Sequence, residues 1–357
     1  MNIGRIVRRI SRACPPLTYL FIPVVKAADR LQGGPLHGAL TASIERYCSD
    51  GQKKNAAYLR RTRRDLWYSF IRYDCPFDEY FMFRFSQLSP AGRHAFVTDY
   101  ENIRLVERIT SPEVRAIFWN KWNTYQAFQP FYHRDAMLID SSTTVDELAA
   151  FTQKHPRFMV KPCESSYGRG IRLVDMHDAS APSLPELLTQ LQSERAMVEE
   201  VIVQCEEMAA FHPASVNTIR CATFQKDGQA VVLFAFMRTG QGSSVVDNGG
   251  AGGLVAAVDI DTGIVYSPGT TEGLMSALVH PDTGKQILGF RVPRWEELKE
   301  LVLRLALVVP QLQYGSWDLA LTDDGWVMVE GNHGGQFLTQ YTARQGLRAR
   351  LSQYFDL

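Results

Sequence analysis

Two carboxylates and an amide near the C-terminus are the residues whose types and spacing most directly indicate metal chemistry. Asp318 lies in one apolar stretch, and Glu330 and Asn332 lie in the next, with Asp323-Asp324-Gly325 between the two stretches. A three-residue hairpin loop would set Asp318 opposite Glu330, with their Cβ atoms about 4.5–5.5 Å apart. Asn332 would point to the same side. Carboxylate and amide oxygens are hard ligands of the kind Mg²⁺ takes, so the spacing predicts a Mg²⁺ site.

Two other interpretations of this hairpin are open. A two-residue turn would shift the register and put Asp318 and Glu330 on opposite faces of the sheet. Alternatively, both acids face solvent on an edge hairpin. Their apolar neighbours favour the metal site, because an unpaired carboxylate among buried apolar residues is costly in free energy. The metal prediction therefore requires the three-residue loop.

A second candidate site follows a predicted strand that ends near Lys161. The loop after it is rich in small residues, namely Ser165, Ser166, Gly168 and Gly170. Backbone N–H groups of such a loop can bind phosphate oxygens, and Lys161 adds a positive charge. No Gly-Lys-Ser/Thr sequence follows the loop and no helix follows the glycines, so neither a P-loop nor a dinucleotide fingerprint is indicated. A plain β-turn is the alternative explanation for the glycines.

Acidic and basic residues downstream extend this set. Backbone groups at the end of a short strand can bind a nucleobase, and a nearby carboxylate can bind ribose hydroxyls; the residues concerned are Glu199, Glu200, Val201, Ile202, Glu206 and Glu207. A solvated acidic strand end is the alternative.

Arg220 and Arg238 lie on consecutive predicted strands, on either side of the turn Lys226-Asp227-Gly228, and come to similar height at one end of the hairpin. Two arginines placed in this way can bind a phosphate or a carboxylate in a bidentate manner. A pair of solvated edge cations is the alternative. The glycine-dense segment 246–253 is typical of a lid or of a loop that approaches a ligand closely.

Two kinds of secondary structure must position these residues. Residues 1 to about 135 show helical spacing of apolar residues, and Ser111-Pro112 predicts the start of a helix that runs through Trp119 and Trp122. From about residue 140 short strands and helices alternate, and the pattern predicts an α+β fold with a helical N-terminal region. Predicted elements include a capping box at 144–147, strands at 157–162, 171–174 and 197–200, helices at 183–194 and 293–308, and hairpin turns at 226–228, 261–263 and 323–325.

Composition excludes several classes of protein. The 357 residues are 45% hydrophobic and 21% charged, which is typical of a globular protein. The formal net charge is zero, so no global positive field points to nucleic acid as a partner. The six cysteines are scattered without a Cys-x-x-Cys pair, which argues against a zinc site or a disulfide framework.

The N-terminal segment has three interpretations. Four arginines precede an apolar run from Leu17 to Val25, which is too short to span a hydrocarbon core of about 30 Å. The segment is a packed or interfacial amphipathic helix, a peripheral membrane contact through residues 1–25, or a signal sequence without a clear cleavage site. We expect a cytoplasmic protein with at most a membrane-peripheral location.

Taken in their order along the chain, these motifs resemble those of the ATP-grasp superfamily, and more narrowly those of the sugar-transfer-associated ATP-grasp proteins. The resemblance covers about residues 55 to 340. It rests on Asp78-Glu79-Tyr80-Phe81, Asn120-Lys121, Val160-Lys161-Pro162 and the segments 215–220, 246–248, 252–253, 258–259, 262–263 and 317–332. Cys163 and Glu164 depart from the small or polar residues expected after Lys161-Pro162.

The resemblance implies a fold and a role for each candidate residue. The fold would consist of two α+β subdomains that grip ATP. Lys121 and Lys161 would bind the α- and β-phosphates under the loop of Ser165, Ser166, Gly168 and Gly170. Adenine would meet Glu199, Glu200, Val201 and Ile202, and ribose would meet Glu206 or Glu207. Mg²⁺ would be held by Asp318, Glu330 and Asn332. The catalytic residues would be Lys161, Arg220 and Arg238, and the residues facing the substrate would be Asn217, Arg238, Asp247, Asn248 and His333.

The resemblance also implies a reaction. It favours an ADP-forming ligase that activates a carboxylate as an acyl phosphate and joins it to an amine or a similar nucleophile, in polysaccharide or natural-product biosynthesis. The substrate would be a small molecule or peptide with a carboxylate, and the acceptor an amine or hydroxyl. The alternatives are a kinase acting on a sugar or polyol hydroxyl and a non-catalytic nucleotide-binding scaffold. Three regions are expected: 1–110, helical; 111–200, with the phosphate loop and the adenine hinge; and 201–357, with the arginine strands and the metal hairpin.

Overall fold

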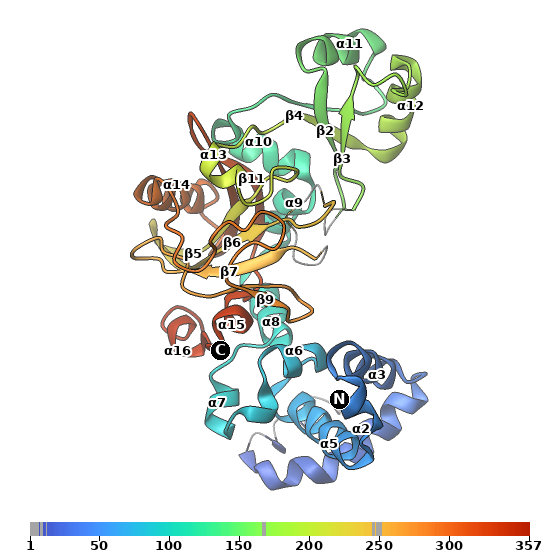
Figure 1. Ribbon diagram of the computed structural model, residues 1–357, viewed down its shortest axis with the longest axis vertical. Coiled ribbons are helices and arrows are strands. Elements are labelled where there is room, and N and C mark those ends of the chain that lie inside the picture. Colours follow the sequence, from blue (N-terminus) through green and yellow to red (C-terminus); the bar gives the residue numbers. More distant parts are fainter. Residues whose placement is uncertain (1–6, 8–9, 12, 166–168, 245–246, 248–251) are drawn as a thin grey trace. The chain divides into compact units, whose positions relative to one another are not determined.

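The protein is described by a computed structural model that covers residues 7, 10–11, 13–165, 169–244, 247 and 252–357. The chain divides into two compact units, Met1–Glu107 with Gln336–Leu357, and Arg108–Gly335. Figure 1 shows their helices and strands. The α+β class predicted from the sequence is confirmed. The predicted division at residues 110 and 200 stays a prediction.

The first unit is helical. Its core is aromatic, and rings of Trp67, Phe70 and Phe77 pack edge-on or stacked with centroids 5.3–6.0 Å apart. In the same unit the Asp65 carboxylate accepts two hydrogen bonds of 2.8 Å from Arg93. The helices are η1 Pro15–Leu17, α2 Thr18–Leu31, α3 Pro35–Tyr47, α4 Asp50–Lys54, α5 Ala56–Tyr73, α6 Phe77–Met82, η2 Phe85–Gln87, α7 Pro90–His94, α8 Asp99–Ile109, α15 Thr339–Ala343 and α16 Arg348–Leu351.

The last 22 residues belong to this helical unit because buried hydrogen bonds tie them to it. The Gln340 amide donates to the Val97 carbonyl at 2.8 Å and accepts from the Val97 N–H at 3.0 Å. It also accepts from the Leu347 N–H at 3.0 Å. Gly346 lies so close to the backbone of Ala95 that a Cβ at this position would come within 2.1 Å of the carbonyl oxygen. Any side chain at 346 would therefore displace the C-terminal segment.

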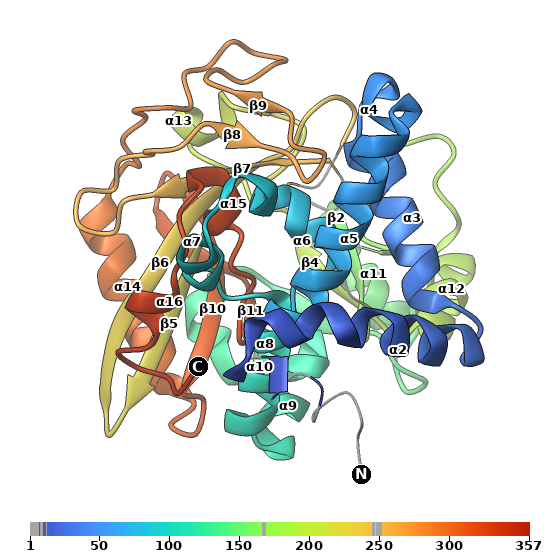
Figure 2. The same cartoon turned by 90° about the horizontal axis from the view of Figure 1, so that it is seen from below.

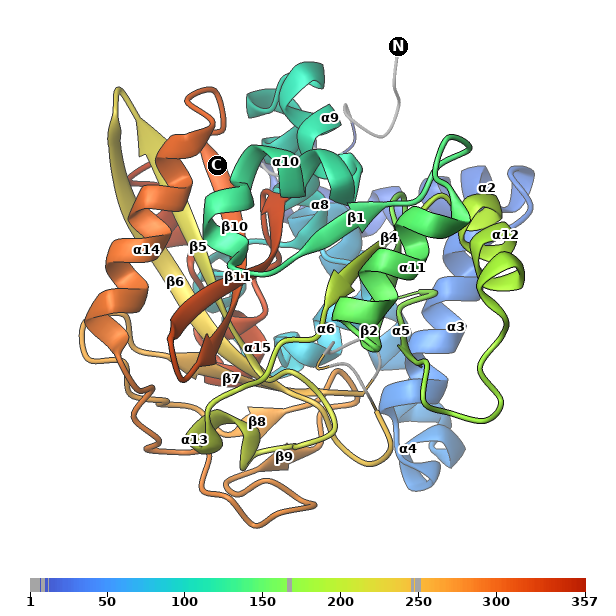
Figure 3. The ribbon, with the colours of Figure 1, turned by 90° about the horizontal axis from the view of Figure 1, so that it is seen from above.

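The second unit contains a four-stranded antiparallel sheet of order β1-β4-β2-β3. Its strands are β1 Ala136–Leu138, β2 Arg157–Pro162, β3 Arg172–Asp175 and β4 Ala196–Glu200. Phe158, Val160 and Val198 pack against α11 Val145–Lys154 and α12 Leu184–Glu194. Side chains alternate along a strand, so Lys161 and Glu199 project from the opposite face. Figure 3 shows α11 and α12 beside β2 and β4.

The larger, seven-stranded sheet has the order β11-β10-β5-β6-β7-β8-β9. One face is apolar: Ile219, Met237 and Trp317 pack with Phe128 of α10 and Leu305 of α14 in one core. The intervening residues of the same strands point to the other face, which carries the charged residues described below. The elements are α9 Pro112–Trp119, α10 Lys121–Tyr132, α13 Glu206–Ala209, β5 Thr218–Lys226, β6 Gln229–Thr239, β7 Leu254–Val258, β8 Gly269–Thr270, β9 Ser276–Ala277, α14 Trp295–Val308, β10 Tyr314–Thr322 and β11 Gly325–His333.

Local signals in the sequence located the starts of two helices of the second unit. Ser111 caps α9 with Pro112 at its first position, and Thr144 forms the predicted capping box of α11. The helix predicted through Trp119 and Trp122 is wrong, because the Asn120 side chain accepts from the N–H groups of Trp122 and Asn123 and starts α10. Lys121 thereby becomes the first residue of a new helix.

We predict that Gln340→Ala lowers the free energy of unfolding by about 1–3 kcal/mol, because it leaves buried backbone groups of Val97 without partners. Urea denaturation of the full chain measures this. Gln353→Ala, at an exposed position near the C-terminus, is the control and should change the free energy of unfolding by less than about 0.5 kcal/mol. Equal effects of the two substitutions would contradict the structural role of Gln340.

Candidate active site

The hairpin of β10 and β11 places two carboxylates side by side. Asp318 and Glu330 are direct cross-strand partners, as predicted, and Asn332 lies two residues further along β11, opposite Ser316. All three point to the charged face of the sheet, away from the core that contains Trp317 and Leu319.

The loop that was predicted to produce this register is wrong. Thr322 pairs with Gly325, so the connection is the two-residue turn Asp323-Asp324 rather than a three-residue loop. The pairing of Asp318 with Glu330 comes instead from a β-bulge. Leu319 pairs with Met328 and Asp318 pairs with Glu330, so Val329 is an extra residue without a cross-strand partner. Because the extra residue lies inside β11 rather than in the turn, Glu330 and Asn332 point to the face opposite to the one they would occupy without the bulge.

Asp318 is buried between two arginines of neighbouring strands. Arg220, directly opposite it on β5, donates from Nε and Nη2 to the two carboxylate oxygens. Arg238 of β6 donates from Nη2 to Asp318 Oδ2 at 2.9 Å and lies 3.3 Å from Asp247 Oδ1. The Thr218 N–H holds the other Asp247 oxygen at 3.1 Å. The two arginines therefore come together as predicted, in a network of alternating charges.

Protonation differs between the two acids of this network. Burial alone would raise the pKa of Asp318, but Arg220 and Arg238 outweigh burial and hold it below its usual value. For Asp247 burial prevails, and the pKa is raised despite Arg238. Asp318 is thus anionic at neutral pH, as a metal ligand or an arginine partner must be.

The residues present fit a divalent cation. Glu330 is half-buried beside Asp318, and two carboxylates with an amide oxygen form the oxygen donor set that Mg²⁺ prefers. The Nδ2 atom of Asn332 is buried and has no hydrogen-bond partner among the described residues. A buried amide donor without an acceptor is costly, so this atom suits a phosphate oxygen beside the cation, whereas Oδ1 of the same amide would be the cation ligand.

A second charged group lies on the small sheet around Glu199. This carboxylate is 2% exposed, pairs with Lys161 and accepts from Arg134 Nη2 at 3.0 Å. Burial by itself would raise the pKa of Glu199, but the two cations lower it below its usual value. Glu199 therefore acts as a counter-ion that holds the Lys161 ammonium group. Its carboxylate is not free to contact adenine, which was its predicted role.

Arg134 joins this group to the metal hairpin. Besides Glu199, it donates to the Met328 carbonyl at 2.6 Å and to the Val329 carbonyl at 3.5 Å, which is the bulge itself. Sequence reasoning missed Arg134, because an arginine between Tyr132 and Asp135 is not distinguishable from a solvated one. Arg134 thereby connects Glu199, the partner of Lys161 on β2, with the bulge that sets the register of β11.

Lys121 and the loop after β2 meet, as the sequence suggested. The Nζ atom of Lys121 donates to the carbonyl oxygen of Ser165 and, at 3.4 Å, to the hydroxyl oxygen of the same residue. The backbone N–H of Lys121 donates to the Cys163 carbonyl at 2.9 Å. Burial lowers the pKa of Lys121, and the nearby Glu330 opposes that shift. Gly170 has φ +75°, and a Cβ there would lie 2.8 Å from Pro162 Cγ, so the glycine is required. Ser166 and Gly168 lie outside the described residues.

The hinge residues fall into two groups. Glu200 pairs with Phe158 and points to the opposite face from Lys161, where its Oε2 accepts from the Asp135 N–H at 3.2 Å. Only its backbone faces the candidate site. Beyond the hinge, the Cys205 N–H donates to the Leu321 carbonyl at 2.9 Å, which ties the start of α13 to β10. Val201 and Ile202 are half-buried, and Glu206 and Glu207 are both exposed.

The predicted substrate residues differ in their surroundings. Asn217 is fully buried, and its Nδ2 donates to the carbonyls of Met208 and His212, so it supports the fold beneath the site. Asp247 belongs to the arginine network, and Asn248 lies outside the described residues. His333 is half-buried at the end of β11, and burial lowers its pKa. Its ring is therefore neutral at pH 7.

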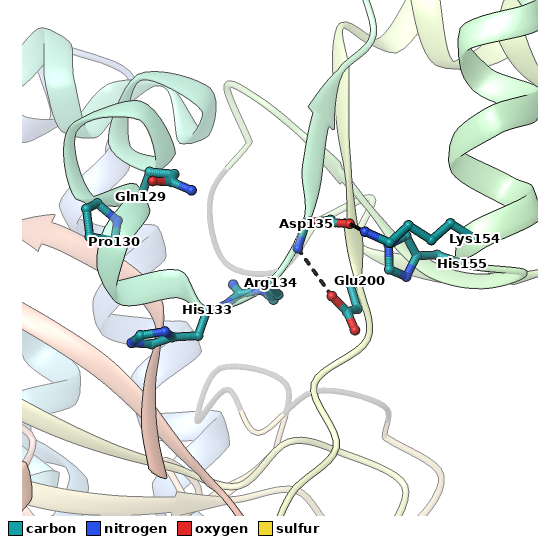
Figure 4. A pocket seen from close by; sticks show the side chains of 8 residues that line it. All are labelled: Gln129, Pro130, His133, Arg134, Asp135, Lys154, His155 and Glu200. Atoms are coloured by element: carbon teal, nitrogen blue, oxygen red, sulfur yellow. Dashed lines mark hydrogen bonds and ion pairs between the residues drawn. The ribbon is translucent and has the colours of Figure 1, made fainter. Parts of the chain in front are cut away.

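A pocket of about 370 Å³ lies on the other face of the small sheet, around Glu200 (Figure 4). Asp135, His155 and Glu200 place ligand atoms within 4.8 Å of one another there. The Asp135 carboxylate already pairs with Lys154 and with His155 at 2.9 Å, and hydrogen bonds from these two side chains lower its pKa. This group includes a histidine nitrogen, whereas the hairpin offers only oxygen ligands from two carboxylates and an amide, so the hairpin suits Mg²⁺ better than this pocket does.

Comparison with known proteins agrees with this geometry. A sequence profile described as sugar-transfer associated ATP-grasp matches residues 100–355. The chain belongs to this family. The match covers more than two thirds of the chain and includes both charged groups described above, and it confirms the predicted ATP-grasp fold. No curated protein sequence matches significantly.

Solved structures resemble this family member only distantly. The ATP-grasp ligase PsnB complexed with minimal precursor has 15% identity and a TM-score of 0.41, over 71% of this chain and 67% of PsnB. D-alanyl-alanine synthetase A from Vibrio cholerae has 14% identity and a TM-score of 0.39, over 68% and 61%. N5-carboxyaminoimidazole synthase from Aspergillus clavatus has 14% identity and a TM-score of 0.40, over 72% and 58%. The chain therefore spans about three fifths to two thirds of the length of these proteins.

We predict that Arg134→Met lowers the free energy of unfolding by about 3 kcal/mol, because Glu199 loses one of its two buried cations. Combining it with Glu199→Gln should cost less than the sum of the two single changes, by about 1 kcal/mol or more. Chemical denaturation of the four proteins measures the coupling. Arg157→Met breaks an exposed pair with Asp175 in the same sheet and should cost less than about 1 kcal/mol. Additive effects of Arg134 and Glu199 would contradict their direct interaction.

A pH dependence follows from Asp318. Its folded-state pKa lies below the usual 3.8, so its stabilising contribution is complete above the unfolded-state pKa and is lost as the pH falls through the folded-state value. The difference in the free energy of unfolding between the natural protein and Asp318→Asn should therefore stay constant above about pH 5 and shrink as the pH falls from about 5 toward about 2. A difference that stays constant over this range would mean that Asp318 is not charged.

Proposed function

We propose that the protein is an ATP- and Mg²⁺-dependent ligase, which phosphorylates a substrate carboxylate and transfers the acyl group to an amine. The observation that carries this proposal is the direct pairing of Asp318 with Glu330 beside Arg220 and Arg238 on one face of the sheet. Carboxylates that hold a cation, next to arginines that bind oxyanions, suit transfer of a phosphoryl group.

The proposed reaction has two steps. A carboxylate oxygen of the substrate attacks the γ-phosphorus of ATP, and the bond to the β,γ-bridging oxygen breaks to release ADP. The amine then attacks the carbonyl carbon of the acyl phosphate, phosphate leaves, and the nitrogen loses a proton to water. Asp318, Glu330 and Asn332 would hold Mg²⁺, which neutralises charge on the phosphate oxygens when bound.

The chain itself would contribute position and charge. Glu199 and Arg134 hold Lys161, and α10 presents Lys121 toward the loop after β2; the two ammonium groups suit the α- and β-phosphates. Arg220 and Arg238 suit the transferred phosphoryl group and the substrate carboxylate, and share Asp318 as counter-ion. Preorganised cations of this kind stabilise developing negative charge without reorganisation during the reaction.

We predict that Asp318→Asn and Glu330→Gln each lower ADP release at least about 100-fold, because each removes a ligand and a charge from the cation site. The assay combines ATP, Mg²⁺ and mixtures of carboxylic acids and amines, with products identified by mass spectrometry. Asp324→Asn changes an exposed acid in the turn of the same hairpin and should leave ADP release unchanged. Circular dichroism verifies that all three variants fold.

The products decide between this proposal and the alternatives. ADP release that requires both a carboxylate and an amine, with an amide as product, supports a ligase. A stable phosphate ester of a sugar or polyol would identify a kinase and contradict the proposal. Nucleotide binding without any turnover in the substrate mixtures, and the same behaviour in Asp318→Asn, would indicate a scaffold.

A further inference from the structure

Helix α2 of the first unit carries an apolar ridge that nothing in the described chain covers. Leu20, Val24 and Leu31 are 68%, 49% and 90% exposed. They are spaced by four and seven residues, so they lie on one side of the helix, and exposed Pro23 and Ala27 fill the space between them. Single exposed apolar residues are normal in a folded protein, but an aligned row indicates a contact surface. We call the surface formed by Leu20, Val24 and Leu31, with Pro23 and Ala27 between them, the α2 ridge.

Cations and a tyrosine border the ridge on the side of α5. Tyr19 stacks on Tyr68 of α5 with ring centroids 4.8 Å apart, and the Arg64 guanidinium lies 5.8 Å from the Tyr19 ring. Lys26 lies 5.6 Å from the ring of Trp67. Arg30, eleven residues after Tyr19, falls on the same side of α2 and is exposed. Figure 2 shows α2 crossing beside α5.

The surrounding segment is strongly basic, although the whole chain is neutral. Residues 18–73 contain ten lysines and arginines and four acidic residues, a formal charge of +6. The acids are engaged: Asp29 is buried and accepts from the N–H groups of Leu36 and His37, Glu45 and Asp50 pair with Lys53, and Asp65 holds Arg93. On α5, Arg60, Arg61, Arg63 and Arg64 are exposed. The positive charge is therefore available to an anionic partner.

We propose that the first unit binds the surface of an anionic lipid bilayer through α2. The α2 ridge lies at the boundary of the acyl chains, Tyr19 lies at headgroup depth, and Lys26, Arg30 and Arg64 meet lipid phosphates. An apolar face bordered by cations is the pattern of helices that lie in the interface plane, and each cation near an anionic surface adds attraction. None of the described helices is both long and apolar enough to cross a bilayer. The helix therefore lies on the membrane, and the residues proposed to bind ATP take no part.

The test uses the full chain and sedimentation with vesicles of phosphatidylcholine alone or with about one third phosphatidylglycerol. We expect binding at least about tenfold tighter to the anionic vesicles, and weaker binding as salt rises from about 0.1 to 0.5 M. The variant Leu20→Gln/Val24→Gln/Leu31→Gln should bind at least about tenfold more weakly. Ile103→Gln, which changes an exposed apolar residue of α8, is the matched control and should bind like the natural protein.

Charge is tested separately. Arg30→Gln/Arg64→Gln should lower binding to anionic vesicles about tenfold or more, whereas Arg350→Gln, at an exposed position of α16, should not. ADP release by the ridge variant should match that of the natural protein, so failure here and failure of the proposed ligase activity are distinguishable. Absence of vesicle binding, or equal binding by the ridge variant, would overturn the proposal. Sedimentation that reveals a dimer, lost in the ridge variant, without vesicle binding would assign the ridge to a second copy and overturn it as well.

Discussion

A carboxylate buried away from water destabilises a protein by several kcal/mol unless cations and hydrogen bonds compensate for the lost solvation. Asp318 satisfies this condition through Arg220 and Arg238, which come from the two strands beyond it in the same sheet. The arrangement exists because β5, β6 and β10 all send apolar side chains to one face. Their alternate residues point to the other face, where Arg220, Arg238 and Asp318 lie together and Phe236 packs beside Arg220. The sheet therefore has one apolar face and one face with a network of charges, and this arrangement forms without a bound ligand.

The bulge at Val329 adds the second carboxylate to this face. Without it, the turn at Asp323-Asp324 would continue the register of Leu319 with Met328 and set Asp318 opposite Val329. Glu330 would then point into the core beside Trp317, which is fully buried. Arg134 occupies the carbonyls of Met328 and Val329 and also neutralises Glu199. The lysine group and the metal hairpin therefore depend on the same guanidinium.

The sequence predicted those features that depend on neighbouring residues. The caps at Ser111 and Thr144 and the strand at 157–162 required only local spacing and alternation. The pairing of Asp318 with Glu330 was predicted from a three-residue loop, and the structure reaches the same pairing through a two-residue turn and a bulge. The bulge could not be predicted, since the residue that donates to its carbonyls, Arg134, is 195 residues away from Val329 in the sequence. The break at Asn120 has a signal in hindsight, because asparagine is a common N-cap. The face occupied by the Glu200 side chain required the register of β4 with β2, which no motif encodes.

The hairpin of β10 and β11 offers one cation position, and a crystal structure with ADP and Mn²⁺ tests it most directly, because Mn²⁺ occupies Mg²⁺ sites and is located by its anomalous scattering. The predicted result is a Mn²⁺ peak bonded to carboxylate oxygens of Asp318 and Glu330, with the diphosphate between the hairpin and Lys161. A peak at Asp135, His155 and Glu200 instead, with Asp318 still bound only to Arg220 and Arg238, would contradict the assignment of the site.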